Sequence, residues 1–262
     1  MEEKKNIEKK NQNIILGLDI STKTIGICLL LDDGSQYGKI IELTHINPRI
    51  KSRKNKEENL FLKAEAFEND FLIKYKDYGI TKCVIEAPLL GSNNANTVST
   101  LLQFNGMVSL AVFKVLGIVP QYISSYDARK YAFPELMGIR KFGKDEKQYD
   151  IKKIRKEITD SKVVLFGSYP WTIDKKTVLQ EKVADIFPQI NWIYDKKGEL
   201  TKENFDSSDS YVCLLGQLNK ERYGELVFTT SDIKETKLPN GSIEFKYKIN
   251  YWDRTEDRAT YC

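Results

Sequence analysis

The chain has 262 residues, 41% of them hydrophobic and 30% charged, with a formal net charge of +4 and a pI of about 8.6. This composition suits a soluble globular protein with a sizeable core, and no window approaches the ~18 uninterrupted apolar residues of a membrane helix. Four scattered cysteines and a single histidine, His45, argue against a disulfide framework, a zinc site or a multi-histidine centre. Any hydrolytic reaction would therefore have to use carboxylates as its catalytic groups.

The first 13 residues, MEEKKNIEKKNQN, are charged throughout and contain no apolar core or small-residue cleavage site. We expect residues 1–13 to form a disordered lead-in rather than a signal peptide, and the protein to act inside the cell without a membrane partner. Basic residues concentrate in two later stretches, 48–56 and 139–157. Such runs are most often solvated faces, so they are weak evidence for a nucleic-acid partner.

The first predicted elements are strands. Residues 14–31 form an apolar run that is broken after Asp19 and ends at Asp32-Asp33-Gly34, a pattern typical of strand, turn and strand. Residues 37–46 would add a third antiparallel strand. An amphipathic helix is then expected over residues 57–75, where apolar residues recur near helical spacing.

A second group of elements predicts parallel strands. Residues 82–90 are a short apolar run of the kind found in strands buried on both faces. A strongly apolar helix is expected over residues 98–116, with Gly106 inside it, followed by a strand within residues 117–125. This alternation of strand, helix and strand predicts a right-handed parallel crossover.

The sequence pattern of the rest of the chain predicts an insertion, then a helix and a β-hairpin. Helices are expected over residues 145–158 and 174–187, within an insertion of about residues 145–203. The next helix would begin with Asp206 or Ser207 as its N-cap and run to about Leu218. Pro239-Asn240-Gly241 then predicts a β-hairpin turn. The expected organisation is a main domain over residues 14–220 and a C-terminal hairpin extension over residues 221–262.

Three of these segments are apolar and yet contain acids: Asp19, Glu86 and the pair Asp206 and Asp209. Taken singly, each acid has an ordinary explanation as a turn residue, a strand-end cap, an N-cap or compensation of the helix dipole. If the two strands are neighbours and the helix packs across their ends, four carboxylates converge and must be neutralised by protons or cations. Oxygen ligands suit Mg²⁺ or Mn²⁺, and a pair of such ions can activate water for phosphodiester cleavage.

Four segments resemble, in order, those of the RuvC-type Holliday-junction resolvases of the ribonuclease H-like superfamily: ILGLDISTKTIGICLL, KCVIEAPLL, LLQFNGMVSLAV and NFDSSDSYVCLL. That family has an Asp in its first strand, a Glu ending a later strand, a helix with L-x-Q-x-x-G and a final helix opening with D-x-x-D. The matching positions here are Asp19, Glu86, Leu101/Gln103/Gly106 and Asp206/Asp209. The family often follows its first Asp with Pro-Gly, where this chain has Ile20-Ser21.

The resemblance implies an α/β fold with a mixed five-stranded sheet, in which antiparallel hairpins are followed by parallel strands, flanked by helices. It also implies a homodimer that nicks four-way DNA junctions, with two Mg²⁺ or Mn²⁺ ions per site held by Asp19, Glu86, Asp206 and Asp209 as catalytic residues. The chain is longer than bacterial resolvases and rich in lysine, which looks more like the viral or phage branch. A phage-encoded enzyme would act in the cytoplasm of a bacterial host.

Contacts to DNA and to a second copy are the least specific predictions. Candidate DNA contacts are Ser21, Thr22, Lys23, Asn93, Asn94, Arg129, Lys130, Lys144 and Lys147. The hydroxyl and amide residues suit turn geometry equally well, whereas the basic residues could neutralise phosphates. Gln103, Gly106 and Leu110 mark a candidate dimer seam, although core packing within a monomer fits the same periodicity.

Three alternatives stay open. GLDISTKTIG also resembles the first phosphate loop of actin, Hsp70 and sugar-kinase ATPases, but those proteins need further Gly-Gly-rich motifs, and this sequence has no Gly-Gly pair. A ribonuclease H or a DDE-type enzyme would share the carboxylates without the D-x-x-D and L-x-Q-x-x-G helices. A non-catalytic DNA-binding protein would not need the four acids.

Overall fold

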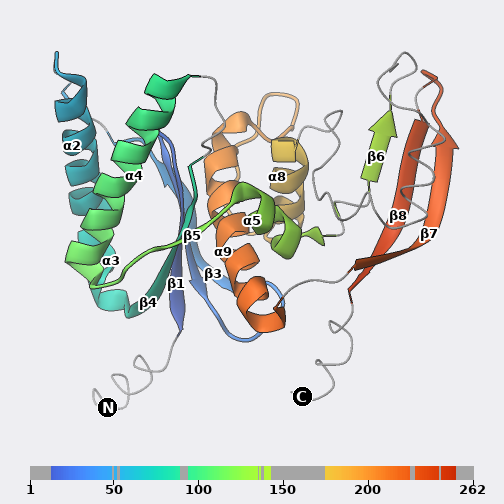
Figure 1. Ribbon diagram of the computed structural model, residues 1–262, viewed down its shortest axis with the longest axis horizontal. Helices are drawn as coiled ribbons and strands as arrows, with labels where there is room; N and C mark the ends of the chain where they lie inside the picture. The colour runs from blue at the N-terminus through green and yellow to red at the C-terminus, as the bar shows by residue number, and fades with distance from the viewer. Residues whose placement is uncertain are drawn as a thin grey trace. The chain divides into compact units, whose positions relative to one another are not determined.

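The computed structural model describes residues 13–48, 50–51, 54–88, 94–134, 136, 139–142, 175–224, 228–241 and 243–251 (Figure 1). The chain divides into two compact units, one of residues 1–125 with 179–215 and one of residues 126–178 with 216–262. Residues 1–12, the expected helix 145–158 and most of the expected insertion lie outside the described residues. Residues 179–203 of that insertion belong to the first unit. The expected boundary near residue 220 stays a prediction.

The first unit contains a five-stranded sheet in the order β3-β2-β1-β4-β5. Its first three strands are antiparallel and connected in sequence: β1 (Ile14–Ile20), β2 (Ile25–Leu31) and β3 (Lys39–Ile46). The next two strands, β4 (Ile80–Glu86) and β5 (Gln121–Ile123), run parallel to β1. This confirms the predicted mixed sheet of antiparallel hairpins followed by parallel strands.

The helix predicted over residues 57–75 is interrupted. It begins as α2 (Lys56–Phe67), continues as a π-helical turn, η1 (Glu68–Leu72), and ends in the short helix α3 (Ile73–Tyr75) and a 3₁₀ turn, η2 (Lys76–Tyr78). The wider π turn allows the adjacent residues Phe71 and Leu72 both to be buried. The predicted helix is therefore present over residues 56–75, with a π-helical turn inside it.

Helix α4 (Ala95–Leu116) connects β4 to β5 and starts three residues before its predicted first residue. Phe104, Val108 and Val112 on one side of α4 are buried against the sheet. Among the described residues, α4 is also the one helix that meets the length and composition of a membrane span. A helix that packs against the core of a globular protein meets the same criteria, so this is weak evidence for a membrane.

The two faces of the sheet are covered by different helices. Leu16 and Leu18 of β1 and Ile85 of β4 belong to the core beneath α2 and α4. Because side chains alternate along a strand, the intervening residues Gly17 and Glu86 belong to the opposite face. The first part of α9 (Phe205–Tyr223) covers that face (Figure 1).

Helix α8 (Lys175–Ile186) precedes α9 and matches the helix predicted over residues 174–187. Its end is followed by Phe187, whose ring packs edge-on against Tyr211 of α9 at 5.1 Å between centroids. Helix α9 begins at Phe205, directly after a 3₁₀ turn, η4 (Lys202–Asn204). Asp206 and Ser207 therefore lie inside the first turn, and the prediction that one of them is the N-cap was wrong.

The second unit holds a three-stranded antiparallel sheet in the order β6-β8-β7. Strands β7 (Phe228–Lys237) and β8 (Ile243–Tyr251) form the predicted C-terminal hairpin around Pro239–Gly241. Strand β6 (Ile139–Phe142) adds a third strand from the basic stretch, where no strand was predicted.

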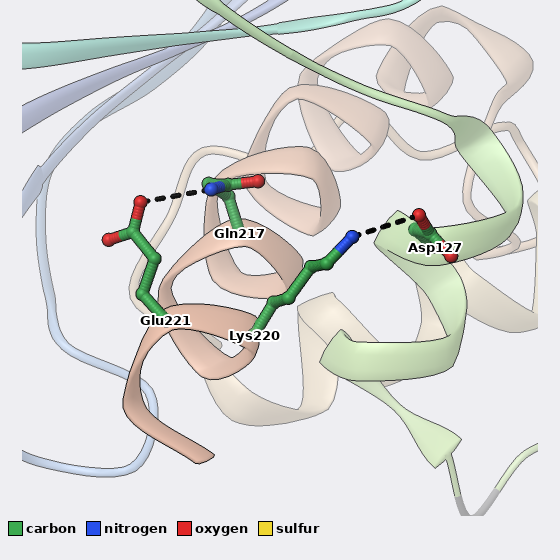
Figure 2. Close-up of polar contacts among 4 residues, drawn as sticks. All are labelled: Asp127, Gln217, Lys220 and Glu221. Atoms are coloured by element: carbon green, nitrogen blue, oxygen red, sulfur yellow. Dashed lines mark hydrogen bonds and ion pairs between the residues drawn. The ribbon is translucent and has the colours of Figure 1, made fainter. Parts of the chain in front are cut away.

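Helix α5 (Ser125–Ala132) packs closely on the last turns of α9 within this second unit. A side chain at Gly216 would lie 2.5 Å from the Ala128 carbonyl oxygen, so only glycine permits this approach. Asn219 donates a hydrogen bond to the Tyr131 carbonyl at 2.9 Å. Figure 2 shows Lys220 paired with Asp127 across the two helices at 3.2 Å, beside the bond from Gln217 to Glu221 on α9.

Candidate active site

Two of the predicted acids end neighbouring parallel strands. Leu18 of β1 pairs with Ile85 of β4, so the next residue of each strand, Asp19 and Glu86, lies at the same carboxyl edge of the sheet. Both residues are half-buried. In open α/β sheets this edge is where ligands bind, because the strand ends and the loops after them form a crevice there.

Helix α9 brings the other two acids to the same edge because two glycines let it approach the sheet. Gly26 of β2 is the cross-strand partner of Asp19, and a Cβ there would lie 1.8 Å from the Asp206 carbonyl oxygen. A Cβ at Gly17 would lie 2.5 Å from the Ser210 carbonyl oxygen. The backbone of α9 therefore rests directly on β1 and β2, with its first turn over the partner of Asp19.

The carboxylate of Asp206 accepts a hydrogen bond from the Thr24 hydroxyl, which belongs to the turn between β1 and β2. Asp209 is almost fully buried, at 4% exposure, one turn further along α9. Burying an ionised carboxylate is costly unless it is paired or hydrogen-bonded. The position of Asp209 thus indicates a site at which negative charge is compensated.

Cys213 of α9 connects this group to Glu86. Its thiol donates a hydrogen bond to the Glu86 Oε2 at 3.4 Å. Burial raises the pKa of Cys213 well above its ordinary value, and the nearby charges of Glu86, Asp19 and Asp209 raise it further. Three carboxylates from two strands and one helix therefore surround a single buried thiol.

These donors suit a divalent cation by their chemistry. Carboxylate oxygens are the ligands that Mg²⁺ and Mn²⁺ prefer, and the four acids lie toward one edge of the sheet. Within the described residues, however, no group of three or more His, Cys, Asp or Glu side chains is placed so that it could hold a metal ion. Instead, Glu86 accepts a hydrogen bond from the Cys213 thiol, and Asp206 accepts one from the Thr24 hydroxyl.

The candidate DNA contacts fall into several places. Ser21, Thr22 and Lys23 lie in the turn after Asp19, where the Ser21 hydroxyl is bonded within the turn and Lys23 is exposed. Asn94 caps α4 by accepting hydrogen bonds from two backbone N–H groups, which is the turn role weighed for it from the sequence. Arg129 and Lys130 lie on α5 in the second unit. The remaining candidates lie outside the described residues: Asn93, Lys144 and Lys147.

The candidate dimer seam lies on the exposed side of α4. Gln103 and Gly106 are exposed, and Leu110 is 59% exposed. A Cβ at Gly106 would have no neighbour within 4 Å. These three residues are therefore absent from the core of this unit.

Three residues of the site were not identified from the sequence: Gly17, Gly26 and Cys213. The signal for the glycines is their position on the same face as Asp19, in strands where a larger residue would otherwise be expected. Cys213 follows Asp209 by four residues, which places both on one side of α9. The contact of Thr24 depends on a pairing across 182 residues, which sequence spacing does not reveal.

Searches against known proteins find distant structural likenesses. Thermus thermophilus RuvC in complex with a Holliday junction substrate aligns with a TM-score of 0.47 and 9% identity, over 81% of this chain and 96% of that chain. The yeast mitochondrial Holliday junction resolvase Ydc2 aligns with a TM-score of 0.41 and 11% identity, over 80% of this chain and 81% of that chain. An Aquifex aeolicus member of the Ppx/GppA family aligns with a TM-score of 0.34 and 11% identity, over 79% of this chain and 90% of that chain.

No family model matches the chain, and no curated protein matches it. Structural likenesses this distant say nothing of the chemistry, which has to be inferred from the chain's own residues.

Proposed function

We propose that this chain is a Mg²⁺- or Mn²⁺-dependent endonuclease that cuts branched DNA, with four-way junctions as the preferred substrate. The observation that carries the proposal is the placement of Asp19 and Glu86 side by side at the carboxyl edge of the sheet, beneath the acidic first turns of α9. Such a cluster of carboxylates requires compensating positive charge, and divalent cations supply it.

Asp19, Glu86, Asp206 and Asp209 would hold the cations, which, when bound, supply water activation and stabilisation of the leaving oxygen. The residues of the chain determine where the scissile phosphate can lie. Asp19 and Glu86 are fixed by neighbouring strands, and the two aspartates are fixed by a helix that glycines bring onto those strands. Rigid elements of this kind hold a catalytic group more precisely than loops do.

The proposal includes a homodimer, because resolving a four-way junction requires two cuts. An apolar surface on α2 and α4 supports it: Phe61, Leu110 and Phe113 are 62%, 59% and 51% exposed. Phe61 and Leu110 also line a groove of about 260 Å³ between these helices. Contiguous exposed apolar surface is a mark of protein–protein interaction sites.

The length of the chain and its lysine content are the grounds for proposing further that the enzyme belongs to the viral or phage branch and acts inside a cell. The basic residues outside the acidic site, such as Lys23 in the turn after Asp19, would contribute phosphate contacts. Binding of DNA should therefore weaken as salt concentration rises.

The test is cleavage of a synthetic four-way junction by wild type, Asp19→Asn and Glu86→Gln. Both variants should lose Mg²⁺-dependent cleavage and still bind the junction, since each change removes one charge and keeps the side-chain size. Full activity in either variant would refute the assignment. A nicked duplex, a flap and an RNA/DNA hybrid run in parallel separate a resolvase from a ribonuclease H or a DDE-type enzyme.

A further inference from the structure

The turn that joins β1 to β2 is closed by its own hydrogen bonds. The Ser21 backbone N–H donates to the Thr24 carbonyl at 2.9 Å, and the Ser21 Oγ accepts from the Thr24 backbone N–H at 3.0 Å. The Lys23 backbone N–H donates to the same Oγ at 3.3 Å. On its outer side, the Thr22 carbonyl accepts from the Lys63 Nζ of α2 at 2.5 Å. These bonds fix the turn to its own strands and to a neighbouring helix.

Proton counting gives this network a direction. Thr24 has one hydroxyl proton, and it is donated to the Oδ2 of Asp206, because a carboxylate only accepts. The Ser21 hydroxyl donates its own proton to the Thr24 carbonyl at 2.9 Å, and Ser21 Oγ lies 3.0 Å from Thr24 Oγ1. The bonds that close the turn and the bond to Asp206 therefore meet at Thr24.

We infer that Thr24 is a positioning residue for Asp206 in the cation site, and that its hydroxyl is not a substrate contact. The inference rests on the proposed function, since it concerns how one of the four carboxylates is held. The turn connects two of them: Asp19 lies two residues before it in β1, and Thr24 binds Asp206 on α9. The Thr24 bond to Oδ2 would fix the orientation in which the Asp206 carboxylate faces a cation.

The geometry excludes a looser role for Thr24. A charge-assisted bond from a hydroxyl to a carboxylate is about twice as strong as a bond between neutral groups. The Thr24 proton that a phosphate oxygen would need is already committed to Asp206. Losing a residue that orients a metal ligand in this way lowers metal affinity or activity by about 10- to 100-fold.

The test compares Thr24→Val, which removes the hydroxyl and keeps the shape, with Thr24→Ser, which keeps the hydroxyl. Thr44→Val is the matched control, because Thr44 lies on β3 and its hydroxyl donates to the His45 backbone carbonyl instead of an acid of the site. Three readouts are needed: Mn²⁺ affinity without DNA, measured by electron paramagnetic resonance of free Mn²⁺; the Mg²⁺ concentration for half-maximal junction cleavage; and the urea midpoint of unfolding.

We expect Thr24→Val to weaken Mn²⁺ binding and to raise the Mg²⁺ requirement, each by about 10-fold. Thr24→Ser and Thr44→Val should stay near wild type in both readouts. Cation affinity that is unchanged in Thr24→Val overturns the inference. Equal loss in Thr24→Val and Thr24→Ser, together with a lower urea midpoint, overturns it as well, since that pattern reports packing.

Asp206→Asn separates this inference from the proposed function. If wild type and Asp206→Asn bind Mn²⁺ alike and neither cuts a junction, the proposed function fails. If Asp206→Asn loses Mn²⁺ binding while Thr24→Val does not, the cation site stands and only the role of Thr24 is refuted.

Discussion

Replacing Gly26 by alanine should move the acids of α9 away from the acids of β1 and β4. The new Cβ would lie 1.8 Å from the carbonyl oxygen and 2.3 Å from the carbonyl carbon of Asp206, whereas real Cβ atoms do not approach other atoms closer than 3.0 Å. Both obstructing atoms are backbone, so no side chain can rotate away. The first turn of α9 must therefore move from β2 by more than 1 Å.

This displacement has a cost in stability and a larger cost in activity. Overpacking a core typically costs about 1–3 kcal/mol, and a backbone obstruction belongs at or above the upper end of that range. Moving catalytic groups by about 1 Å costs about 100-fold in rate. We expect Gly26→Ala to lose about 3 kcal/mol of unfolding free energy and to cleave junctions at least about 100-fold more slowly than wild type.

Urea unfolding measures the loss of unfolding free energy. Single-turnover junction cleavage, at a temperature where the variant is folded, measures the loss of rate. Gly106→Ala is the matched control for stability alone, because a Cβ there meets nothing within 4 Å and alanine is favoured over glycine inside a helix by about 0.5–1 kcal/mol. Its cleavage is not the comparison, since Gly106 belongs to the candidate dimer seam. Wild-type stability and cleavage in Gly26→Ala would show that α9 does not rest on β2 as described.

Two further predictions concern the thiols and the exposed face of α4. Burial raises the pKa of Cys28 and Cys83 far above the ordinary 9.0, so above about pH 9 only the unfolded chain releases these protons. The unfolding free energy should fall with pH there by up to about 1.4 kcal/mol per pH unit for each thiol. Cys83→Ala should make that decline shallower in urea titrations at pH 8 to 10.5, and an identical slope would contradict the burial. Leu110→Glu should shift the protein toward monomer in sedimentation equilibrium while Ile41→Glu on β3 does not, and equal effects of both would refute the α4 seam.

The strands and the four acids were accessible from sequence because each depends on local pattern. Strands β1 and β4 are apolar runs, and an acid such as Asp19 or Glu86 near the end of such a run is conspicuous. The parallel pairing followed from the alternation of strand, helix and strand. The structure then placed Asp19 and Glu86 at adjacent strand ends, as the convergence hypothesis required.

The features that were missed depend on contacts between distant segments. Gly26 looks like any glycine in a strand until α9 is known to lie 1.8 Å from its missing Cβ. The start of α9 at Phe205 depends on the preceding 3₁₀ turn rather than on a capping side chain, so the rule that favours Asp206 or Ser207 failed. The π turn at Glu68–Leu72 lies where the adjacent residues Phe71 and Leu72 are both buried, and helical periodicity does not predict it.

The central claim is that Asp19, Glu86, Asp206 and Asp209 form one cation site. The most direct measurement is anomalous diffraction from a crystal of the protein soaked in Mn²⁺. We predict Mn²⁺ bound at the carboxyl edge of β1 and β4, with carboxylate oxygens of these residues at about 2.2 Å. Strong Mn²⁺ peaks elsewhere on the protein, with none at this edge, would contradict the account.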